Sequence, residues 1–284
     1  MTVRIVTDST ADFSAAEAEA LGVTIVPLIV TFGDEAFLDQ IEITPEQFYE
    51  RLVRSAVFPR TSQPPMGAFQ QAYAGLAAAG ATEILCITVS SRLSGTLNSA
   101  RLAASEAPTG CRVYTLDSLT VAGGLGALVE RAVKVVEQGG SAEGAAEAVR
   151  AQIPRHQITI LLDTLEYLQK GGRIGKARAL LGGMLNIKPI VYVKEGEVGS
   201  AERVRNRARG IERIFDKTIE LPDVERVIVQ HTGAISDAEA LATRLRSALP
   251  GIDVGIKWIG PVVGAYAGPN GLGTVAIQRV VGSG

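Results

Sequence analysis

Short apolar runs rich in β-branched residues alternate with alanine-rich stretches through the first half of the chain. The runs at 3–7, 24–30, 84–89 and 112–116 predict strands, and the stretches between them carry apolar residues at helical spacing. Strands that alternate with helices usually pair in parallel through right-handed crossovers. The pattern therefore predicts an α/β domain with a parallel sheet, whose ligand sites lie beyond the carboxyl ends of the strands.

The pattern changes around residues 139–157, where glycine, serine and proline interrupt it. We place a domain boundary near residue 153, which gives an N-terminal α/β domain at 1–153 and a smaller C-terminal α/β domain at 154–284. The second domain is predicted to contain a mixed sheet, with a hairpin turn in KEGEV at 194–198. Its expected strands lie at 158–162, 188–193, 226–230, 252–258 and 274–280, and its expected helices at 164–170, 202–216 and 236–248.

Composition narrows the class of protein. The chain of 284 residues has a net charge of −2 and only 5% aromatic residues, which disfavours nucleic acid as a partner. No apolar run reaches the ~18 residues of a membrane span, and the first residues lack a signal-peptide pattern. The two cysteines have no metal-ligand spacing. We therefore expect a cytoplasmic, two-domain protein without a metal site.

Residues 90–100, SSRLSGTLNSA, follow the strand expected at 84–89 and precede a predicted helix. A serine nucleophile, a nucleotide loop and a cradle for a small anion are the three candidates for such a stretch. The nucleotide loop is disfavoured, because neither a P-loop nor a G-x-G-x-x-G spacing follows any strand. A serine nucleophile needs a nearby base, and the chain offers only His156, in an expected surface turn, and His231. A hydrolase or phosphotransfer enzyme that uses Ser94 or His231 is the alternative function.

A binding site for a small anion needs fewer specific residues than a serine nucleophile or a nucleotide loop. Ser94, Gly95 and Thr96 precede a helix expected to begin near Leu97, and the free N–H groups and dipole of a helix start favour a negative charge. Gly95 permits close approach of a ligand, and the two hydroxyls can donate hydrogen bonds to it. Simple capping of the helix by Ser94 or Thr96 is the structural alternative.

A second stretch of this kind is TSQPP at 61–65. It places Thr61 and Ser62 before a helix start that Pro64 and Pro65 predict. Capping is again the structural alternative for the stretch taken alone. Together, the two stretches indicate one shared anionic ligand.

Two downstream segments are basic. Residues 163–189 combine a leucine-rich helix, a Gly-Gly break and several basic side chains, including Arg173. Residues 203–209 contain four arginines, beginning with Arg203, which a helix would distribute over two faces. A solvated helical face is the structural alternative to a docking or gating surface. Arg173 and Arg203 are therefore candidates for docking to a partner or for transient contact with a membrane.

In this order, the segments resemble the DegV family of fatty-acid-binding proteins, which includes the binding subunits of bacterial fatty acid kinase. The resemblance covers essentially the whole chain. Its most specific part is SSRLSGT at 90–96 together with LEYLQKGGRIG at 165–175. The resemblance runs from TDSTAD at 7–12 and TSQP at 61–64, through DTLEYLQKGGRIG at 163–175 and LNIKPI at 185–190, to GPVVGAYAGPNGLG at 260–273.

The resemblance implies two α/β domains that hold one long-chain fatty acid, such as palmitate, in a buried apolar tunnel. Thr61 and Ser94 would bind its carboxylate, with Ser62, Gly95 and Thr96 adjacent. In kinase-linked members, the acid is presented to a separate ATP-using catalytic subunit. The chain would then be a non-catalytic carrier in fatty acid transport or metabolism, with the fatty acid as ligand and no cofactor. A regulatory protein–protein module that reads the ligand as a signal is a third hypothesis.

Tyr266 departs from the family pattern. The family usually has the motif G-x-H-x-G-P-G, with histidine at the position that Tyr266 occupies between Gly264 and Asn270. A tyrosine hydroxyl can still donate one hydrogen bond to a carboxylate, but unlike histidine it cannot become a cation at neutral pH. We expect Tyr266 in the head-group shell, with carboxylate binding retained and the handling of an acyl phosphate changed.

Overall fold

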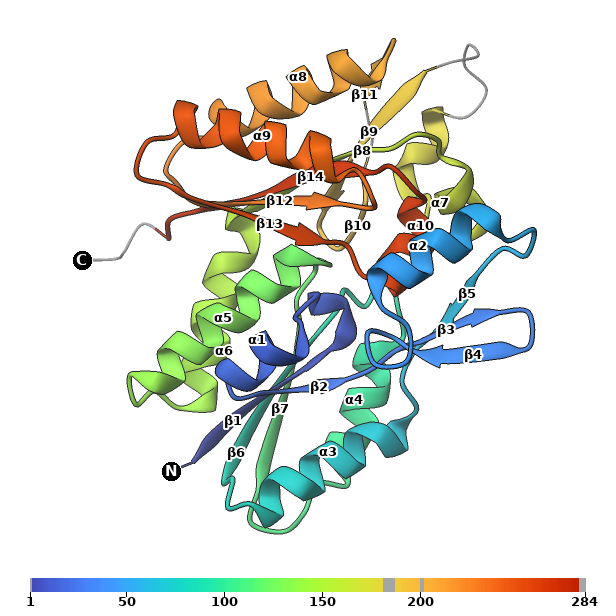
Figure 1. The fold of residues 1–284 in the computed structure, drawn as a ribbon. Helices are drawn as coiled ribbons and strands as arrows, with labels where there is room; N and C mark the ends of the chain where they lie inside the picture. The colour runs from blue at the N-terminus through green and yellow to red at the C-terminus, as the bar shows by residue number, and fades with distance from the viewer. Residues whose placement is uncertain (1, 181–186, 200–201, 281–284) are drawn as a thin grey trace.

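The computed structural model describes residues 2–180, 187–199 and 202–280 of the chain. Its first main sheet contains four parallel strands, as predicted, and Figure 1 shows it in the lower half of the molecule. The strand order is β2 (Val23–Val26), β1 (Val3–Asp8), β6 (Glu83–Thr88) and β7 (Arg112–Asp117). The apolar run of β6 is buried along its whole length, because helices cover both faces of the sheet.

Successive side chains of β6 point to opposite faces of this sheet. Ile84 and Cys86 pack in one core, against two helices on that face, whereas Leu85 and Ile87 pack in another core on the opposite face. The helices of the first core are α3 (Met66–Ala78) and α4 (Thr96–Ser105); those of the second are α1 (Ala15–Ala20), α5 (Gly123–Glu137) and α6 (Ala142–Gln152).

A separate three-stranded antiparallel sheet lies beside the first one, and the sequence pattern did not predict it. It contains β3 (Ile29–Phe32), β4 (Glu35–Leu38) and β5 (Arg60–Ser62), and α2 (Pro45–Arg54) connects the last two. The prediction of one strand at 24–30 is therefore wrong. Pro27 lies between β2 and β3, and it has no N–H to continue a ladder of hydrogen bonds.

Thr61 and Ser62 lie on β5 and not at a helix entrance. The prolines do precede a helix, since Pro65 is the N-cap of α3, but that helix begins only at Met66. On β5, Thr61 pairs with Val30 and Ser62 pairs with Ile29. The expectation of hydroxyls immediately before the helix is therefore wrong for this stretch.

The second main sheet is mixed, as predicted, and it contains all the strands after residue 153. Its strands are β8 (His156–Leu161), β9 (Lys188–Lys194), β10 (Glu197–Val198), β11 (Glu202–Val204), β12 (Val224–His231), β13 (Asp253–Trp258) and β14 (Leu272–Gln278). Only β12 and β13 pair in parallel. The hairpin turn predicted in KEGEV is confirmed, because β9 and β10 are antiparallel neighbours.

The helices of the C-terminal half are α7 (Glu166–Lys170), α8 (Arg207–Ile219), α9 (Ile235–Ala248) and α10 (Pro261–Ala267). The helix predicted at 202–216 is wrong at its start, because Glu202–Val204 forms β11. Asn206 caps α8, its side chain accepting a hydrogen bond from the Arg209 N–H. Arg203 therefore lies on a strand and shares no helical face with Arg207.

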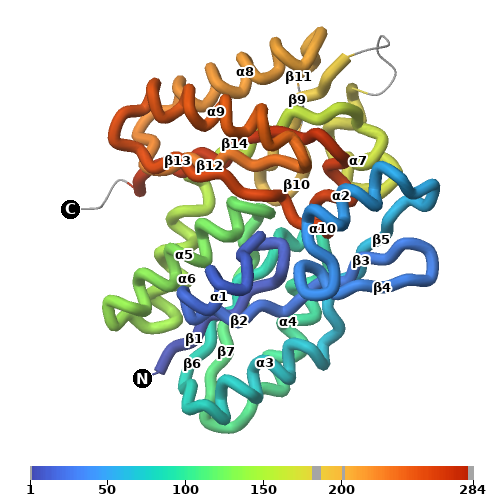
Figure 2. Tube along the Cα trace, viewed as in Figure 1, coloured from blue at the N-terminus to red at the C-terminus, as the bar shows by residue number. Residues whose placement is uncertain are grey.

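Both faces of the second sheet are covered. Helices α8 and α9 pack on its outer face, at the top of Figure 1, and Figure 2 shows the same layers along the Cα trace. The inner face belongs to the same core as α5, α6 and part of the first sheet, with Ile160 and Val191 among its members. The structure confirms an α/β fold with a parallel sheet and a mixed sheet. The boundary near residue 153 stays a prediction.

Candidate functional site

A cavity lies where the carboxyl ends of the parallel strands meet the inner face of the second sheet. It contains about 720 Å³ of space that no protein atom occupies, including solvent at its open mouth. Thirteen of its eighteen described lining residues are apolar: Leu28, Val89, Leu93, Val121, Ile160, Leu162, Leu168, Val191, Val193, Val198, Val262, Val263 and Ala267. The other five are Thr10, Thr61, Ser94, Arg173 and Tyr266.

Topology explains how one wall of the cavity forms. Thr10, Leu28, Val89 and Val121 follow β1, β2, β6 and β7, so the ends of all four parallel strands contribute to it. Loops after parallel strands gather at one edge of a sheet. The site lies at the edge that the strand pattern predicts.

The opposite wall comes from strands of the second sheet. Ile160 of β8 pairs with Val191 of β9, and Val193 follows two residues later on the same face. The hairpin continues this wall, since Val198 of β10 pairs with Val193. Branched apolar side chains therefore cover the side of the cavity that faces the parallel sheet.

Thr61 and Tyr266 meet at the cavity although they lie far apart in the sequence. The Thr61 Oγ1 and the Tyr266 hydroxyl oxygen are 2.5 Å apart, and either group can donate the hydrogen bond. Thr61 comes from β5, and Tyr266 comes from α10. Ser62, the next residue on β5, is exposed and does not line the cavity, because neighbouring side chains of a strand point to opposite faces.

Ser94 lies one residue before Gly95, which is the N-cap of α4, a helix whose first residue is Thr96. The Ser94 Oγ accepts a hydrogen bond from the Thr96 N–H at 3.3 Å and lies 2.9 Å from the Thr96 hydroxyl. Among the described residues, no hydrogen bond uses the N–H groups of Gly95 and Leu97. Gly95 is therefore the N-cap of the helix, and Ser94 lines the cavity wall beside the free N–H groups of Gly95 and Leu97.

The two hydroxyl-rich loops touch each other at Gly95. A Cβ placed on Gly95 would lie 2.0 Å from the Gln63 Oε1, so only glycine leaves room for that amide. The Gln63 Nε2 donates to the Ser99 hydroxyl at 3.0 Å, which fixes the side chain across the start of α4. Gln63 was not predicted as a site residue, although its place within TSQP was the available signal.

Arg173 lines the cavity beside Tyr266. Its Nε donates to the Leu93 carbonyl at 3.0 Å, its Nη1 donates to the Gly171 carbonyl at 2.9 Å, and its Cζ lies 5.0 Å from the centre of the Tyr266 ring. The guanidinium is the only cation among the described lining residues. Arg173 therefore adds a positive charge to the polar end of the site. From the sequence it was predicted only as a docking residue.

Arg203 lies apart from this group. It pairs with Pro189 across the sheet, its Nη2 donates to the Leu180 carbonyl at 2.8 Å, and it does not line the cavity. Its exposed position leaves the docking role a prediction.

The loop at 90–96 is held from both domains. Within the N-terminal half, Asp117 accepts a hydrogen bond from the Ser91 N–H at 3.1 Å. Across the cavity, the Ser90 hydroxyl donates to the Gly196 carbonyl at 2.6 Å, and Arg92 forms an ion pair with Glu197 at 2.9 Å. The turn of the β9–β10 hairpin thus rests on the loop that carries Ser94.

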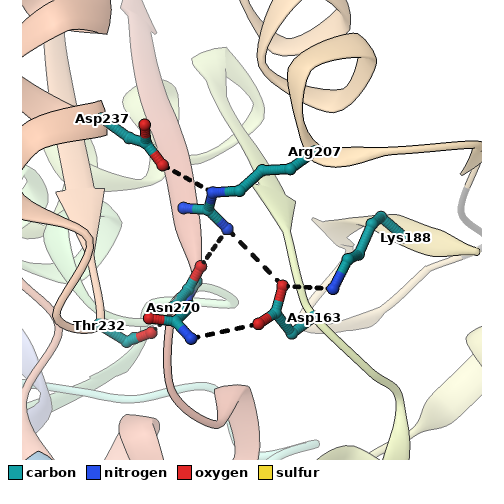
Figure 3. Close-up of polar contacts among 7 residues, drawn as sticks. Asp163, Lys188, Arg207, Thr232, Asp237 and Asn270 are labelled. Carbon is teal, nitrogen blue, oxygen red and sulfur yellow. Dashed lines mark hydrogen bonds and ion pairs between the residues drawn. The ribbon is translucent and has the colours of Figure 1, made fainter. Parts of the chain in front are cut away.

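A polar network behind α10 joins three segments of the family resemblance (Figure 3). Asp163 accepts from Lys188 at 2.8 Å and from the Asn270 side chain at 3.2 Å. Arg207 donates to the Asn270 carbonyl at 2.7 Å and to Asp237 at 2.6 Å. The network braces the loop after α10 without lining the cavity. Residues 185 and 186, at the start of the LNIKPI segment, lie outside the described residues.

Neither histidine lines the cavity that Ser94 lines. His231 is buried, packs against Trp258 with ring centres 4.3 Å apart, and does not line the cavity. The surface turn expected for His156 is wrong, because both of its ring nitrogens are buried at the start of β8, where burial lowers its pKa to about 4. The described residues therefore supply no histidine base for a serine nucleophile in the cavity.

Neither a metal-ligand cluster nor a membrane-spanning helix occurs in the described residues. No group of three or more His, Cys, Asp and Glu side chains is arranged to hold a metal ion. None of the helices in the described ranges is long and apolar enough to cross a membrane.

A family model described as "Uncharacterised protein, DegV family" matches residues 2–279 of the chain. The chain belongs to the DegV family. A DegV domain-containing protein from Deinococcus radiodurans is 38% identical over 288 residues, which cover 98% of this chain and 99% of that protein.

Solved DegV structures share the fold. A DegV family protein from Thermus thermophilus, described by its fatty acid binding, is 34% identical, has a TM-score of 0.89, and covers 98% of this chain and 100% of its own. A stearic acid-binding protein from Eubacterium ventriosum is 28% identical, has a TM-score of 0.90, and covers 99% of each chain. The predicted two-domain DegV fold is confirmed.

Proposed function

We propose that this DegV protein binds one long-chain fatty acid, such as palmitate, with the tail in the apolar cavity and the carboxylate at its polar end. The observation that carries the proposal is the meeting of Thr61, Ser94, Arg173 and Tyr266 at a cavity whose other lining residues, Thr10 apart, are apolar. The fatty-acid-binding descriptions of the DegV proteins from Thermus thermophilus and Eubacterium ventriosum support the same ligand class.

The tail supplies most of the affinity. Burial of an apolar chain contributes ~0.8 kcal/mol per methylene, so the methylenes of palmitate contribute on the order of 10 kcal/mol before the costs of binding. The β-branched walls formed by β8 and β9 offer the required apolar surface, and they contain no polar side chain that the tail would leave unpaired.

The head group supplies orientation. Thr61, Ser94 and Tyr266 carry hydroxyls that can donate to a carboxylate, and hydrogen bonds to a charged group contribute about 1.5–3 kcal/mol each. Arg173 adds the positive charge that Tyr266 cannot supply in place of the family histidine. Gly95 and Thr96 belong to the adjacent shell, at the start of α4.

Native mass spectrometry of the protein with added lipids tests the proposal. We expect one bound palmitate per chain, weak binding of octanoate because its tail is short, and weak binding of 1-hexadecanol because it lacks the carboxylate. A protein that binds none of the three, or that binds 1-hexadecanol as tightly as palmitate, would contradict it.

We further propose that the bound acid is presented to the catalytic subunit of a fatty acid kinase, so that the chain itself is a carrier in fatty acid transport or metabolism. The family resemblance supports this role, and transient contact with a membrane stays a prediction. An assay for palmitoyl phosphate with ATP and such a subunit tests it, because product should form only when both proteins are present. If Arg203 docks the partner, Arg203→Ala should slow this reaction with the palmitate Kd unchanged.

A further inference from the structure

Three aspartates are buried behind the cavity wall, and the proposed function uses none of them. Asp8, Asp12 and Asp39 follow strands of the N-terminal half or end them, and each is at most 7% exposed. Asp8 is well paired, since it accepts hydrogen bonds from the Thr10 N–H at 3.0 Å and the Val89 N–H at 2.7 Å. In contrast, no well-formed hydrogen bond among the described residues reaches Asp12 Oδ2 or either oxygen of Asp39.

Asp12 holds the start of α10. Its Oδ1 accepts a hydrogen bond from the Gly260 N–H at 3.0 Å, and Gly260 is the N-cap of that helix. A Cβ on Gly260 would lie 2.6 Å from the same oxygen and 2.9 Å from the Gln40 Nε2. Gln40 in turn donates to the Ser9 carbonyl at 2.7 Å. Glycine at position 260 thus lets two side chains of the N-terminal half reach the helix start.

Tyr49 holds the same helix start from α2. Its hydroxyl donates to the Ile259 carbonyl at 2.8 Å, directly before the helix. One turn further along, a Cβ on Gly264 would lie 2.3 Å from this hydroxyl, so the ring packs against the helix backbone. Asp39 lies beside the same helix start, with the Ser9 hydroxyl and the Val262 N–H close to its carboxylate.

The other end of α10 reaches the head-group site. The helix has seven residues, which corresponds to a length of about 10 Å. Val262 and Val263 near its start line the cavity, and Tyr266 near its end meets Thr61. A two-turn helix moves largely as a unit, so a shift at Gly260 displaces the Tyr266 hydroxyl as well.

We propose that Asp12, Asp39 and Tyr49 are positioning residues for the fatty-acid head group, because they fix the N-terminus of α10 and thereby hold Tyr266 against Thr61. This inference rests on the proposed fatty-acid binding, in which Tyr266 belongs to the head-group shell. It assigns the buried carboxylates a role at a site that they do not touch.

The two buried carboxylates should make the positioning of α10 by Asp12, Asp39 and Tyr49 depend on pH. Burial raises the pKa of Asp39 to about 7, and burial together with the neighbouring Asp39 carboxylate raises the pKa of Asp12 well above its usual range. The other charged or titratable groups near them are Asp8 of β1, whose pKa burial raises to about 6, Tyr49 of α2, and Lys257 of β13, which pairs with Glu17 of α1 at 2.8 Å. Above pH 7, the ionised Asp39 carboxylate is buried away from water, so an opening at the start of α10 that hydrates it becomes more favourable.

Hydrogen exchange of α10 tests the positioning group without any ligand. After correction for the intrinsic rate, we expect the amides of α10 to exchange about 5-fold faster at pH 8.5 than at pH 6 in the wild type. Asp39→Asn should remove this difference, because the amide keeps the shape and cannot ionise. Asp34→Asn, in the exposed turn between β3 and β4, is the matched control and should keep it. If the exchange of α10 in Asp39→Asn still differed between the two pH values as in the wild type, the proposal would be overturned.

Palmitate affinity tests whether the group acts through Tyr266. Asp12→Ala should weaken binding about 10-fold, whereas Asp12→Asn, which keeps an acceptor for the Gly260 N–H, should restore most of it. In a Tyr266→Phe background, Asp12→Ala should have little further effect, because the hydroxyl that it positions is gone. An equal loss in both backgrounds would show a general structural role and would contradict the proposal.

The two measurements separate this inference from the proposed function. A wild type that binds no palmitate would overturn the fatty-acid proposal, and the exchange of α10 would still show whether Asp39 controls the helix start. A wild type that binds palmitate with an α10 insensitive to pH and to Asp39→Asn would overturn only the positioning proposal.

Discussion

Thr61 and Ser62 are neighbours on β5, but the pleat of the strand turns only the Thr61 side chain toward the cavity. The sequence TSQPP does not show which of the two hydroxyls faces the cavity. Its two prolines indicate a helix start, and the residues before them are too few to indicate a strand. The binding loops were predictable from their residue types, whereas the side that each hydroxyl faces required the pairing of β5 with β3.

The hydroxyls of Thr61 and Ser94 should matter for palmitate binding. We expect Ser94→Ala and Thr61→Val each to raise the palmitate Kd by about 10- to 100-fold, because each removes a hydrogen bond to a charged group. Titration calorimetry measures the effect. Ser62→Ala is the matched control on the other face of β5, and a loss for Ser62→Ala equal to that for Thr61→Val would contradict the assignment.

Arg173 was visible in the sequence as a basic residue after a Gly-Gly break, but its role was not. A basic segment at the end of a predicted helix indicates a helical face that is exposed to solvent. The turn after α7 instead returns the guanidinium to the Leu93 carbonyl, which comes from the loop at 90–96. Such a contact between segments 80 residues apart has no local signal.

At the scale of elements, α10 depends on glycine where side chains of other elements touch it. A Cβ on Gly264 would lie 2.3 Å from the Tyr49 hydroxyl, whereas a Cβ on Gly75 in α3 would meet nothing within 4 Å. We expect Gly264→Ala to lower the free energy of unfolding by about 1–3 kcal/mol through overpacking. Gly75→Ala, the matched control in an open helix position, should raise it by up to about 1 kcal/mol. Urea denaturation measures both variants. An unchanged free energy of unfolding in Gly264→Ala would contradict the close packing of Tyr49 against α10.

The β9–β10 hairpin makes two contacts with the loop at 90–96, and they should differ in strength. Ser90→Ala removes a buried hydroxyl from the Gly196 carbonyl, which should cost about 1–3 kcal/mol of stability. Arg92→Ala breaks an exposed ion pair with Glu197 and should cost less than about 1 kcal/mol. Chemical denaturation distinguishes the two, and a larger effect for Arg92→Ala would be inconsistent with this ranking.

Elements with strong patterns were predictable, and elements set by tertiary contacts were not. The apolar run of β6 is buried on both faces and appears in the sequence as a continuous strand signal. In contrast, β11 has three residues and pairs only with β9, so its sequence continues into the helical pattern of α8. Short strands of this kind form because a neighbouring edge is available, which local periodicity does not record.

For the molecule as a whole, the buried aspartates should make stability depend on pH. The ordinary pKa of an aspartate is about 3.9. Burial raises the pKa of folded Asp39 to about 7, so the folded state binds more protons than the unfolded state between these values. Stability from this group therefore falls as the pH rises from about 4 to 7, and stays low above 7.

Asp39→Asn should remove this loss. We expect the variant to exceed the wild type in free energy of unfolding by about 2–4 kcal/mol at pH 8 and by little at pH 4. Denaturation at the two pH values, with Asp34→Asn as the exposed control, measures the difference. A variant that is less stable than the wild type at pH 8 would show that the ionised carboxylate is stabilised by contacts that this account does not contain.

The overall organisation followed from the strand pattern, because parallel strands with helical crossovers place their carboxyl ends at one edge. What the pattern could not show is that a mixed second sheet covers this edge and leaves a cavity between the two sheets. Ile160 and Val191 belong to the second sheet yet share a core with α5 and the first sheet. The packing of the two halves against each other is therefore the part of the site that sequence periodicity leaves open.

A crystal structure of the protein with palmitate would show whether an acyl chain occupies the cavity and where its carboxylate lies. We predict density for one acyl chain between the valine side chains of β9 and β10 and the ends of the parallel strands. Its carboxylate should lie within hydrogen-bond distance of Thr61, Ser94 or Tyr266. A cavity without the ligand, or a carboxylate bound away from all three hydroxyls, would contradict the account.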